Sequence, residues 1–362
     1  IHECGTERAS RMCHAGQLGL RERVEAASAG QLRLVDTPDR GRCLEAVTDL
    51  PAGHRLRDAA VVPHGSSLGR HLARVSSCED VASTEMLAAL DFLASLLLDL
   101  HVSTGESVLH DLHAFPGEPP KVPLIRRWHK RWSSSLTDLV AVSELEQAWA
   151  HVIPNWRQLT VSCPVGRKVV TPEGEMPALS HDMVCGLWLH MALCEHSCDP
   201  NCSLVHDGDD LWLVMMRPVA AGCPITTSYL DVAGLLKPVQ DRQQELQDGW
   251  GFHCACHRCS LESESESPEL SLEPLLMGCS SPPGLLHAER NEYMTLLHQL
   301  LARVRTLHNA HSPAEQMLLL LQSLFAPTEL QEDACREHAE ACAWLFGAES
   351  RFGLWARELL QR

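Results

Sequence analysis

Three cysteines lie within six residues in the motif CACHRC, at residues 254–259. Three thiolates this close together can face one metal ion, and structural zinc takes four sulfur or nitrogen ligands in a tetrahedron. The fourth ligand must therefore come from elsewhere. Cys198 is the leading candidate, and its rivals are Cys202, His253 and His257. A metal-free cluster is disfavoured, because thiols crowded this closely in a reducing compartment usually bind metal.

The other cysteines do not indicate a secreted disulfide scaffold. The sixteen cysteines are spread over 362 residues, whereas disulfide-dense secreted domains are short. No signal peptide opens the chain, and the longest apolar stretch, at 86–100, is interrupted by Asp91 and Asp99. We expect a reduced, cytoplasmic or nuclear protein with no membrane span. Because the first residue is Ile1, we expect the chain to begin inside a longer product.

The charge of the chain limits its partners. Thirty Lys and Arg against 47 Asp and Glu give 30 − 47 = −17. A field this negative disfavours direct binding of nucleic acid and of anionic membranes, and favours a basic protein segment. Trp128 and Trp132 are interleaved with basic residues, but their spacing is typical of the apolar stripe of an amphipathic helix. We expect a monomer.

Hydrophobic patterning predicts a mixed α+β chain. The expected strands flank turns at 36–39 and 51–53 and recur at 59–63, 211–216 and 225–229. The expected helices cover 11–28, 83–100, 125–139, 288–308, 314–325, 329–346 and 350–360. Alternating Glu and Ser at 262–268 predict a mobile linker before the last four helices.

Tyrosine is scarce. Tyr229 and Tyr293 are the only two in the chain, and Tyr229 ends a strand-like segment within TTSYLD at 226–231. Tyr293 falls in a helical pattern and is expected to pack. Taken alone, Tyr229 would be interpreted as a core or sheet-face residue.

Four motifs in a fixed order resemble the SET-domain lysine methyltransferases, and in particular their SET-and-MYND (Smyd-like) branch. They are GRCL at 41–44 before LPAG at 50–53, ALCEHSCDPN at 192–201, VAAG at 219–222 before ITTSYLD at 225–231, and FHCACHRC at 252–259. Pro238, Arg242 and a helical C-terminal region also match. IHEC at 1–4 is similar to the end of a MYND finger, so that finger is expected to be absent or truncated in this chain.

The resemblance implies an α+β SET fold of small curved β-sheets with a pseudo-knot, in which the segment 195–201 is threaded beside the segment carrying Tyr229. It also implies a helical insert, a zinc-bound post-SET segment and a C-terminal helical bundle. The expected boundaries are an N-terminal helical segment at 1–30, the SET N-terminal part at 31–65, a mostly helical insert at 66–183, the SET C-terminal part at 184–235, the post-SET zinc segment at 236–262, a flexible linker at 263–284 and a C-terminal helical region at 285–362.

The activity implied is methyl transfer from S-adenosylmethionine to a lysine of a histone or another protein. The implied catalytic residue is Tyr229, whose hydroxyl would position the amine and the methyl group. The implied cofactor-binding residues are Arg40, Gly41, Arg42, Glu195, His196, Tyr229 and Phe252, with Phe252 stacked on the adenine. One structural zinc is implied on Cys198, Cys254, Cys256 and Cys259, and four thiolates leave it no open position for substrate.

Three departures from the family pattern lie at the implied site. Glu195 stands where the motif has Asn, Cys43 where a Gly lies close to the cofactor, and Trp250 where a Tyr often lines the lysine channel. Cys223 and Pro224 replace acidic residues in a nearby loop. The alternative is therefore a catalytically weak or inactive SET-fold protein that acts as a protein-interaction scaffold.

Overall fold

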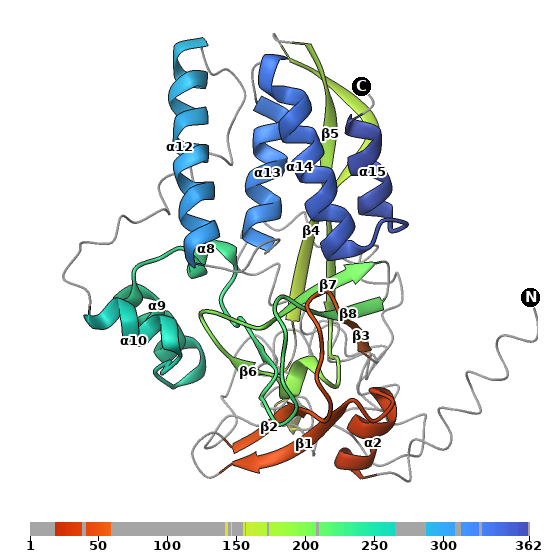
Figure 1. The fold of residues 1–362 in the computed structure, drawn as a ribbon, viewed down its shortest axis with the longest axis vertical. Coiled ribbons are helices and arrows are strands. Elements are labelled where there is room, and N and C mark those ends of the chain that lie inside the picture. The colour runs from red at the N-terminus through yellow and green to blue at the C-terminus, as the bar shows by residue number, and fades with distance from the viewer. Residues whose placement is uncertain are drawn as a thin grey trace, which may run out of the picture.

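The computed structural model describes residues 19–37, 41–58, 157–171, 174–207, 210–264, 287–307, 313–325 and 328–360, with single positions between 142 and 155. Figure 1 shows the arrangement of these parts. A helix and a β-hairpin from the N-terminal part lie at one end, four C-terminal helices lie at the other, and a three-stranded sheet lies between them.

The N-terminal part is one helix packed on one hairpin. Helix α2 (Leu20–Ala27) precedes the antiparallel strands β1 (Leu32–Thr37) and β2 (Gly41–Ala46). Leu32 and Leu34 are buried on one face of β1, which confirms the alternation in the sequence. The helix expected at 11–28 is confirmed from Leu20 to Ala27, and residues 11–18 lie outside the described part.

The central sheet has the order β3-β8-β7, with both pairs antiparallel. Its strands are β3 (Arg55–Asp58), β8 (Asp210–Met215) and β7 (Cys202–Asp207). The strand predicted at 211–216 is confirmed as β8. The predicted strand at 59–63 lies outside the described residues.

Two very short strands bring two distant segments of the chain side by side, and this strand pair is called the crossing below. Strand β6 (Glu195–His196) follows the 3₁₀ turn η2 (Met191–Leu193) and pairs in parallel with β9 (Thr226–Thr227). The strand expected at 225–229 is limited to these two residues, because the Ser228 hydroxyl donates a hydrogen bond to the Leu230 carbonyl and turns the chain.

The described end of the insert is a hairpin and not helical. Strands β4 (Arg157–Thr171) and β5 (Gly174–Gly186) pair antiparallel along their length. The mostly helical insert predicted at 66–183 is therefore wrong for this stretch, and the helices expected at 83–100 and 125–139 lie outside the described residues. The physical reason is β-propensity: Thr160, Val161, Val165, Val169, Val170 and Thr171 are β-branched.

Three helices follow the crossing. They are α8 (Val232–Leu235), α9 (Val239–Trp250) and α10 (His257–Glu264). Gly251 ends α9 in the left-handed conformation at φ 77°, which glycine adopts without strain. The linker predicted from Glu262 is wrong for residues 262–264, because α10 continues to Glu264 and Glu262 forms ion pairs with Arg242 and Arg258. The rest of the predicted linker lies outside the described residues.

The four C-terminal helices confirm the prediction closely. They are α12 (His287–Leu307), α13 (Pro313–Phe325), α14 (Thr328–Phe346) and α15 (Arg351–Leu360). Buried leucines of α12 and α13, among them Leu297 and Leu318, form their shared core. Among the described residues, no helix is both long and apolar enough to cross a bilayer.

Arg55 joins this bundle to the central sheet. Its guanidinium donates hydrogen bonds of 2.6 Å to the Leu345 carbonyl and 2.9 Å to the Phe346 carbonyl, at the C-terminal end of α14. It also lies 5.6 Å above the centre of a Trp212 ring on β8. The last carbonyls of a helix lack partners within the helix and carry partial negative charge, so a cation stabilises this end.

We expect Arg55→Ala to lower the free energy of unfolding by about 1.5–3 kcal/mol, since hydrogen bonds from a charged donor to helix-end carbonyls are lost. Urea unfolding of the full chain measures this. The control is Arg21→Ala, which removes an ion pair with Asp36 between two exposed side chains and should cost less than about 1 kcal/mol. Equal urea midpoints for wild type and Arg55→Ala would contradict the assignment.

Candidate functional site

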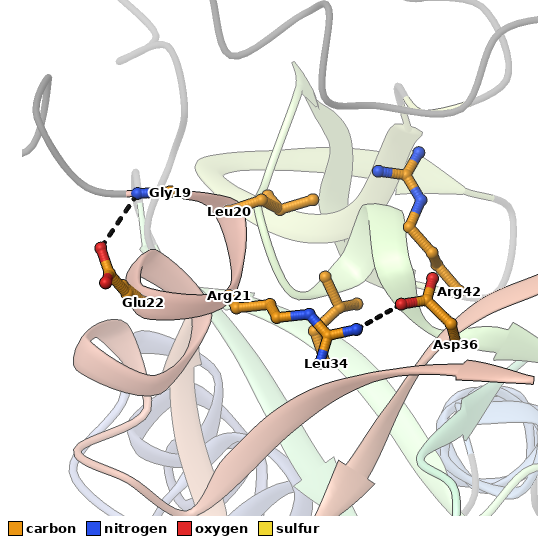
Figure 2. A pocket seen from close by; sticks show the side chains of 7 residues that line it. All are labelled: Gly19, Leu20, Arg21, Glu22, Leu34, Asp36 and Arg42. Atoms are coloured by element: carbon orange, nitrogen blue, oxygen red, sulfur yellow. Dashed lines mark hydrogen bonds and ion pairs between the residues drawn. The ribbon is translucent and has the colours of Figure 1, made fainter.

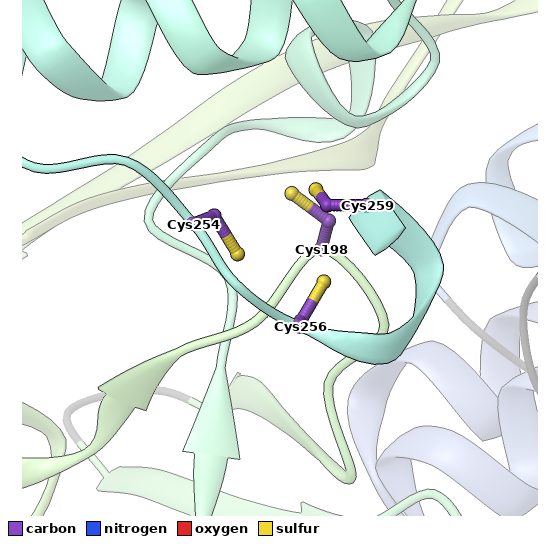
Figure 3. Close-up of side chains that lie close together, drawn as sticks. All are labelled: Cys198, Cys254, Cys256 and Cys259. Atoms are coloured by element: carbon purple, nitrogen blue, oxygen red, sulfur yellow. The ribbon is translucent and has the colours of Figure 1, made fainter. Parts of the chain in front are cut away.

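Four cysteine side chains converge beside the β6–β9 crossing. The sulfur atoms of Cys198, Cys254, Cys256 and Cys259 all lie within 4.8 Å of one another (Figure 3). Cys198 comes from the segment after β6, and the other three from the start of α10 and the residues before it. Among the rivals for the fourth position, Cys202 lies in a separate apolar core, and His253 and His257 are exposed.

The convergence changes the acidity of the thiols. A hydrogen bond between Cys198 and Cys254 raises the pKa of the Cys198 thiol and lowers that of Cys254. A hydrogen bond from Cys198 also lowers the pKa of Cys256 to about 5. A donor set of four soft sulfurs, three of them buried, has the composition of a closed structural zinc site.

Two buried arginines contact the group of four cysteines. Arg242 on α9 has no exposed surface, and its Nη2 lies 3.6 Å from the Cys259 sulfur as a donor. Arg258 on α10 donates a 3.1 Å hydrogen bond to the Cys198 carbonyl. Glu262 accepts from both guanidiniums and balances one of the two charges. The second positive charge can pair with ionised sulfurs, and such pairing is needed because a buried charge is costly when it has no partner.

A glutamine holds the backbone of the cysteine segment. The Gln243 side chain donates to the Cys254 carbonyl and accepts from the Cys254 amide, both at 2.7 Å. This two-point contact fixes the path of the backbone between the end of α9 and Cys254. Sequence analysis missed Gln243, because a glutamine within a helical pattern gives no local signal of such a contact.

Tyr229 packs against the same apolar cluster that contains Cys198 and Cys254. Its hydroxyl donates a 2.8 Å hydrogen bond to the Cys194 carbonyl, and its backbone amide donates to Nδ1 of His196 at 3.0 Å. The Tyr229 ring lies 5.6 Å from the Trp250 ring and 6.2 Å, edge-on, from the Phe252 ring. These distances are typical of direct aromatic contact.

Side chains reinforce the crossing itself. Asn201 accepts a 2.8 Å hydrogen bond from the Thr226 amide and donates one of 2.8 Å to the Pro224 carbonyl. In return, the Asn201 amide donates to the Thr226 hydroxyl at 3.0 Å. Two backbone pairs alone would be a weak ladder, so these reciprocal bonds secure the threaded arrangement that the sequence predicted.

A buried aspartate holds the backbone that leads into β6. Asp58, at the end of β3, accepts hydrogen bonds from the backbone amides of His190 and Met191 at 2.9 and 2.8 Å. The His190 ring is also buried, and although burial opposes its charge, the Asp58 carboxylate raises its pKa. Sequence analysis missed Asp58, because its partners lie more than 130 residues away.

The predicted cofactor residues fall into two groups. Glu195, His196, Tyr229 and Phe252 lie together at the crossing, with the His196 ring 5.3 Å from that of Tyr229 and 5.8 Å from that of Phe252. Gly41 and Arg42 lie on β2, and Arg40 is outside the described residues.

Arg42 lines a cavity beside helix α2. This cavity of about 450 Å³ lies between α2 and the β1–β2 hairpin and is also lined by Gly19, Leu20, Arg21, Glu22, Leu34 and Asp36 (Figure 2). None of the predicted residues at the crossing lines this cavity. The described structure therefore brings four predicted cofactor residues together, and Arg42 lines a cavity to which those four do not contribute.

The departures from the family pattern occupy distinct places. Glu195 is half-buried in β6, Cys43 is 1% exposed within β2, and half-buried Trp250 contacts Tyr229. Cys223 is exposed. Glu195 and Trp250 thus lie at the crossing itself.

Comparison with known proteins identifies the family. A SET-domain family model matches residues 41–230, more than half of the chain. Over 79 residues the chain is 40% identical to the histone-lysine N-methyltransferase SMYD3 of Mus musculus, covering 22% of this chain and 18% of that protein. Over 188 residues it is 26% identical to the N-lysine methyltransferase SMYD2-A of Xenopus laevis, covering 52% and 41%. It is also 37% identical over 86 residues to the SET domain and MYND-type zinc finger protein 6 of Schizosaccharomyces pombe, covering 23% and 17%.

The matched segments span less than half the length of each of these relatives. The family match nevertheless includes both strands of the crossing, the central sheet β3-β8-β7 and Tyr229. With these features, the chain belongs to the SET-domain family, and it is similar to SET-and-MYND proteins within that family.

Proposed function

We propose that this chain is an S-adenosylmethionine-dependent protein-lysine N-methyltransferase. The observation that supports it most directly is the parallel pairing of β6 with β9, which brings Tyr229 against His196 and Phe252. Membership of the SET-domain family supports this reaction class. Two of the similar proteins are named as lysine methyltransferases.

The residues at the crossing fit the proposed cofactor. Phe252 is half-buried and contacts Tyr229 and His196 through its ring, so it is suited to stack on an adenine. The Glu195 carboxylate can accept a hydrogen bond from the ammonium group of the cofactor. When bound, S-adenosylmethionine supplies a methyl group that its sulfonium already activates. The chain then has to bind a neutral lysine amine, align it and exclude water.

Tyr229 is suited to align the amine. Its hydroxyl proton is directed to the Cys194 carbonyl, so the phenolic oxygen would meet the amine as a hydrogen-bond acceptor. The phenol thereby orients the nucleophile without losing its own proton. Trp250 and Phe252 pack around it and exclude water from the same side.

The four cysteines are proposed to hold one structural zinc. Tetrathiolate zinc carries net negative charge, and the buried Arg242 beside Cys259 supplies a matching positive charge. The ion would fix Phe252 and Trp250, which directly precede the cysteine motif, over the crossing. It leaves no position for substrate and takes no part in the chemistry.

The proposed substrate is a lysine in a basic segment of a histone or another protein, since the net charge of −17 attracts such segments. We propose that the protein acts as a monomer in the cytoplasm, the nucleus or both, without binding nucleic acid or membrane. The alternative, a weakly active or inactive interaction scaffold, is favoured by Glu195 and Trp250 at the crossing.

We expect one zinc per chain in protein purified without chelator, and we expect Cys256→Ser to lower that content because one ligand is lost. Elemental analysis measures the metal, and limited proteolysis should show faster cleavage within 250–259. The matched control is Cys223→Ser, since Cys223 is exposed and outside the four-cysteine group. A fully folded chain without metal would contradict the zinc assignment.

We expect Tyr229→Phe to lower methyl transfer to a basic peptide library by more than about 100-fold, because a misplaced nucleophile loses at least that much. The affinity for S-adenosylmethionine should stay nearly unchanged, since the ring remains. Tyr293→Phe, on α12, is the control and should keep wild-type activity. If the two variants were equally active, Tyr229 would be only a packing residue.

We expect Glu195→Asn to tighten binding of S-adenosylmethionine by about 1–3 kcal/mol, because an amide offers a donor that a carboxylate lacks and removes a negative charge near the cofactor carboxylate. Calorimetry on zinc-loaded wild type and variant measures this. Adding Trp250→Tyr should raise methyl transfer further by restoring a hydroxyl. If neither protein bound cofactor while zinc was present, the scaffold alternative would replace the enzyme.

A further inference from the structure

His196 lies between the cysteine centre and the tyrosine. Its Nε2 is 3.3 Å from the sulfur of Cys198, and its Nδ1 is 3.0 Å from the backbone nitrogen of Tyr229. The same residue belongs to β6, where it pairs with Thr227 of β9. One imidazole ring therefore contacts both the cysteine centre and the tyrosine assigned to catalysis.

The Tyr229 contact fixes where the ring carries its proton. A backbone amide can only donate, so Nδ1 must be the accepting nitrogen. A neutral imidazole has one donor and one acceptor, and the proton therefore resides on Nε2. Nε2 then donates to the Cys198 sulfur, and such a bond is strengthened when the sulfur is ionised.

We propose that His196 is a positioning residue that couples the metal on Cys198 to the backbone of Tyr229. This inference rests on the zinc centre of the proposed function. Any change at the sulfur of Cys198 moves or weakens the N–H···S bond and, through the rigid ring, alters the bond from the Tyr229 amide. Groups beyond the metal ligands commonly tune a metal site in this way. Here the effect would pass from the metal site to the backbone of the residue assigned to catalysis.

Two substitutions separate the two contacts of the ring. His196→Asn keeps an acceptor near the position of Nδ1, within reach of the Tyr229 amide, but has no atom that reaches Cys198. His196→Gln places an amide donor near the position of Nε2, toward Cys198, but offers no acceptor at the position of Nδ1. Each variant thus retains one contact and removes the other, and each is the control for the other.

The chain makes the readout simple, because it contains only Tyr229 and Tyr293. Labelling tyrosine with ¹⁵N in the full chain gives two amide cross-peaks, and Tyr293 on α12 is an internal reference. Zinc is then exchanged for cadmium, which lengthens the bonds to sulfur. We expect the Tyr229 cross-peak to shift by more than its linewidth in wild type and to stay in place in His196→Asn, while the Tyr293 cross-peak stays in place in both.

Cobalt substitution tests the other contact. The sulfur-to-cobalt charge-transfer band should move to longer wavelength in His196→Asn, because the N–H···S bond that stabilises the sulfur electrons is lost. His196→Gln should keep the band near its wild-type position, while its Tyr229 cross-peak moves and becomes insensitive to the metal. A merely structural role for His196 would not give these opposite responses.

The outcomes separate this inference from the zinc assignment. Elemental analysis of each sample reports whether metal is bound at all, and a metal-free wild type would overturn the zinc centre and this inference with it. A metal-loaded wild type whose Tyr229 cross-peak ignores the exchange would overturn only the coupling. A shift equal in wild type and His196→Asn would also overturn it, and would assign the effect to the Trp250 and Phe252 rings.

Discussion

The parallel pairing of β6 with β9 is the constraint on which the site depends. It aligns Glu195 with Thr226 and His196 with Thr227, and it is only two residues long. Glu195 and His196 lie in this pair, and the pair also fixes the segments that carry Cys198 and Tyr229. Cys198 follows two residues after β6 and Tyr229 two residues after β9, so the pairing sets the relation between the cysteine centre and the tyrosine.

A ladder this short needs support from outside, and the structure supplies it on three sides. Asn201 ties the segment after β6 to Thr226, and Asp58 holds the backbone that enters it. The cysteine centre closes the third side, where Arg242 compensates the charge of the sulfurs. The supports are polar and buried, so removing one partner leaves the other unsatisfied, which makes the arrangement specific.

Features with a local or periodic cause were predictable from the sequence. The alternation of Leu32 and Leu34 gave β1, apolar spacing gave the four C-terminal helices, and cysteine spacing indicated a centre that Cys198 completes. Features with a distant cause were not. Glu262 stands in an acidic serine-rich run typical of a linker, and its half-buried ion pair with Arg242, 20 residues earlier in the chain, depends on the packing of α9 against α10. Long-range pairs of this kind leave no mark on local composition.

The central sheet has a further consequence for how such chains can diverge. Strand β3 pairs with β8 from Asp58 to Leu211, so this pairing closes the connection that contains the insert. The entropy of closing a flexible loop grows only logarithmically, and each doubling of its length costs about 0.6 kcal/mol. Lengthening or shortening the insert is therefore cheap for the sheet, whereas one residue added between β6 and Cys198 would shift the sulfur away from its partners. Tolerance to insertion and intolerance to it exist side by side in one domain.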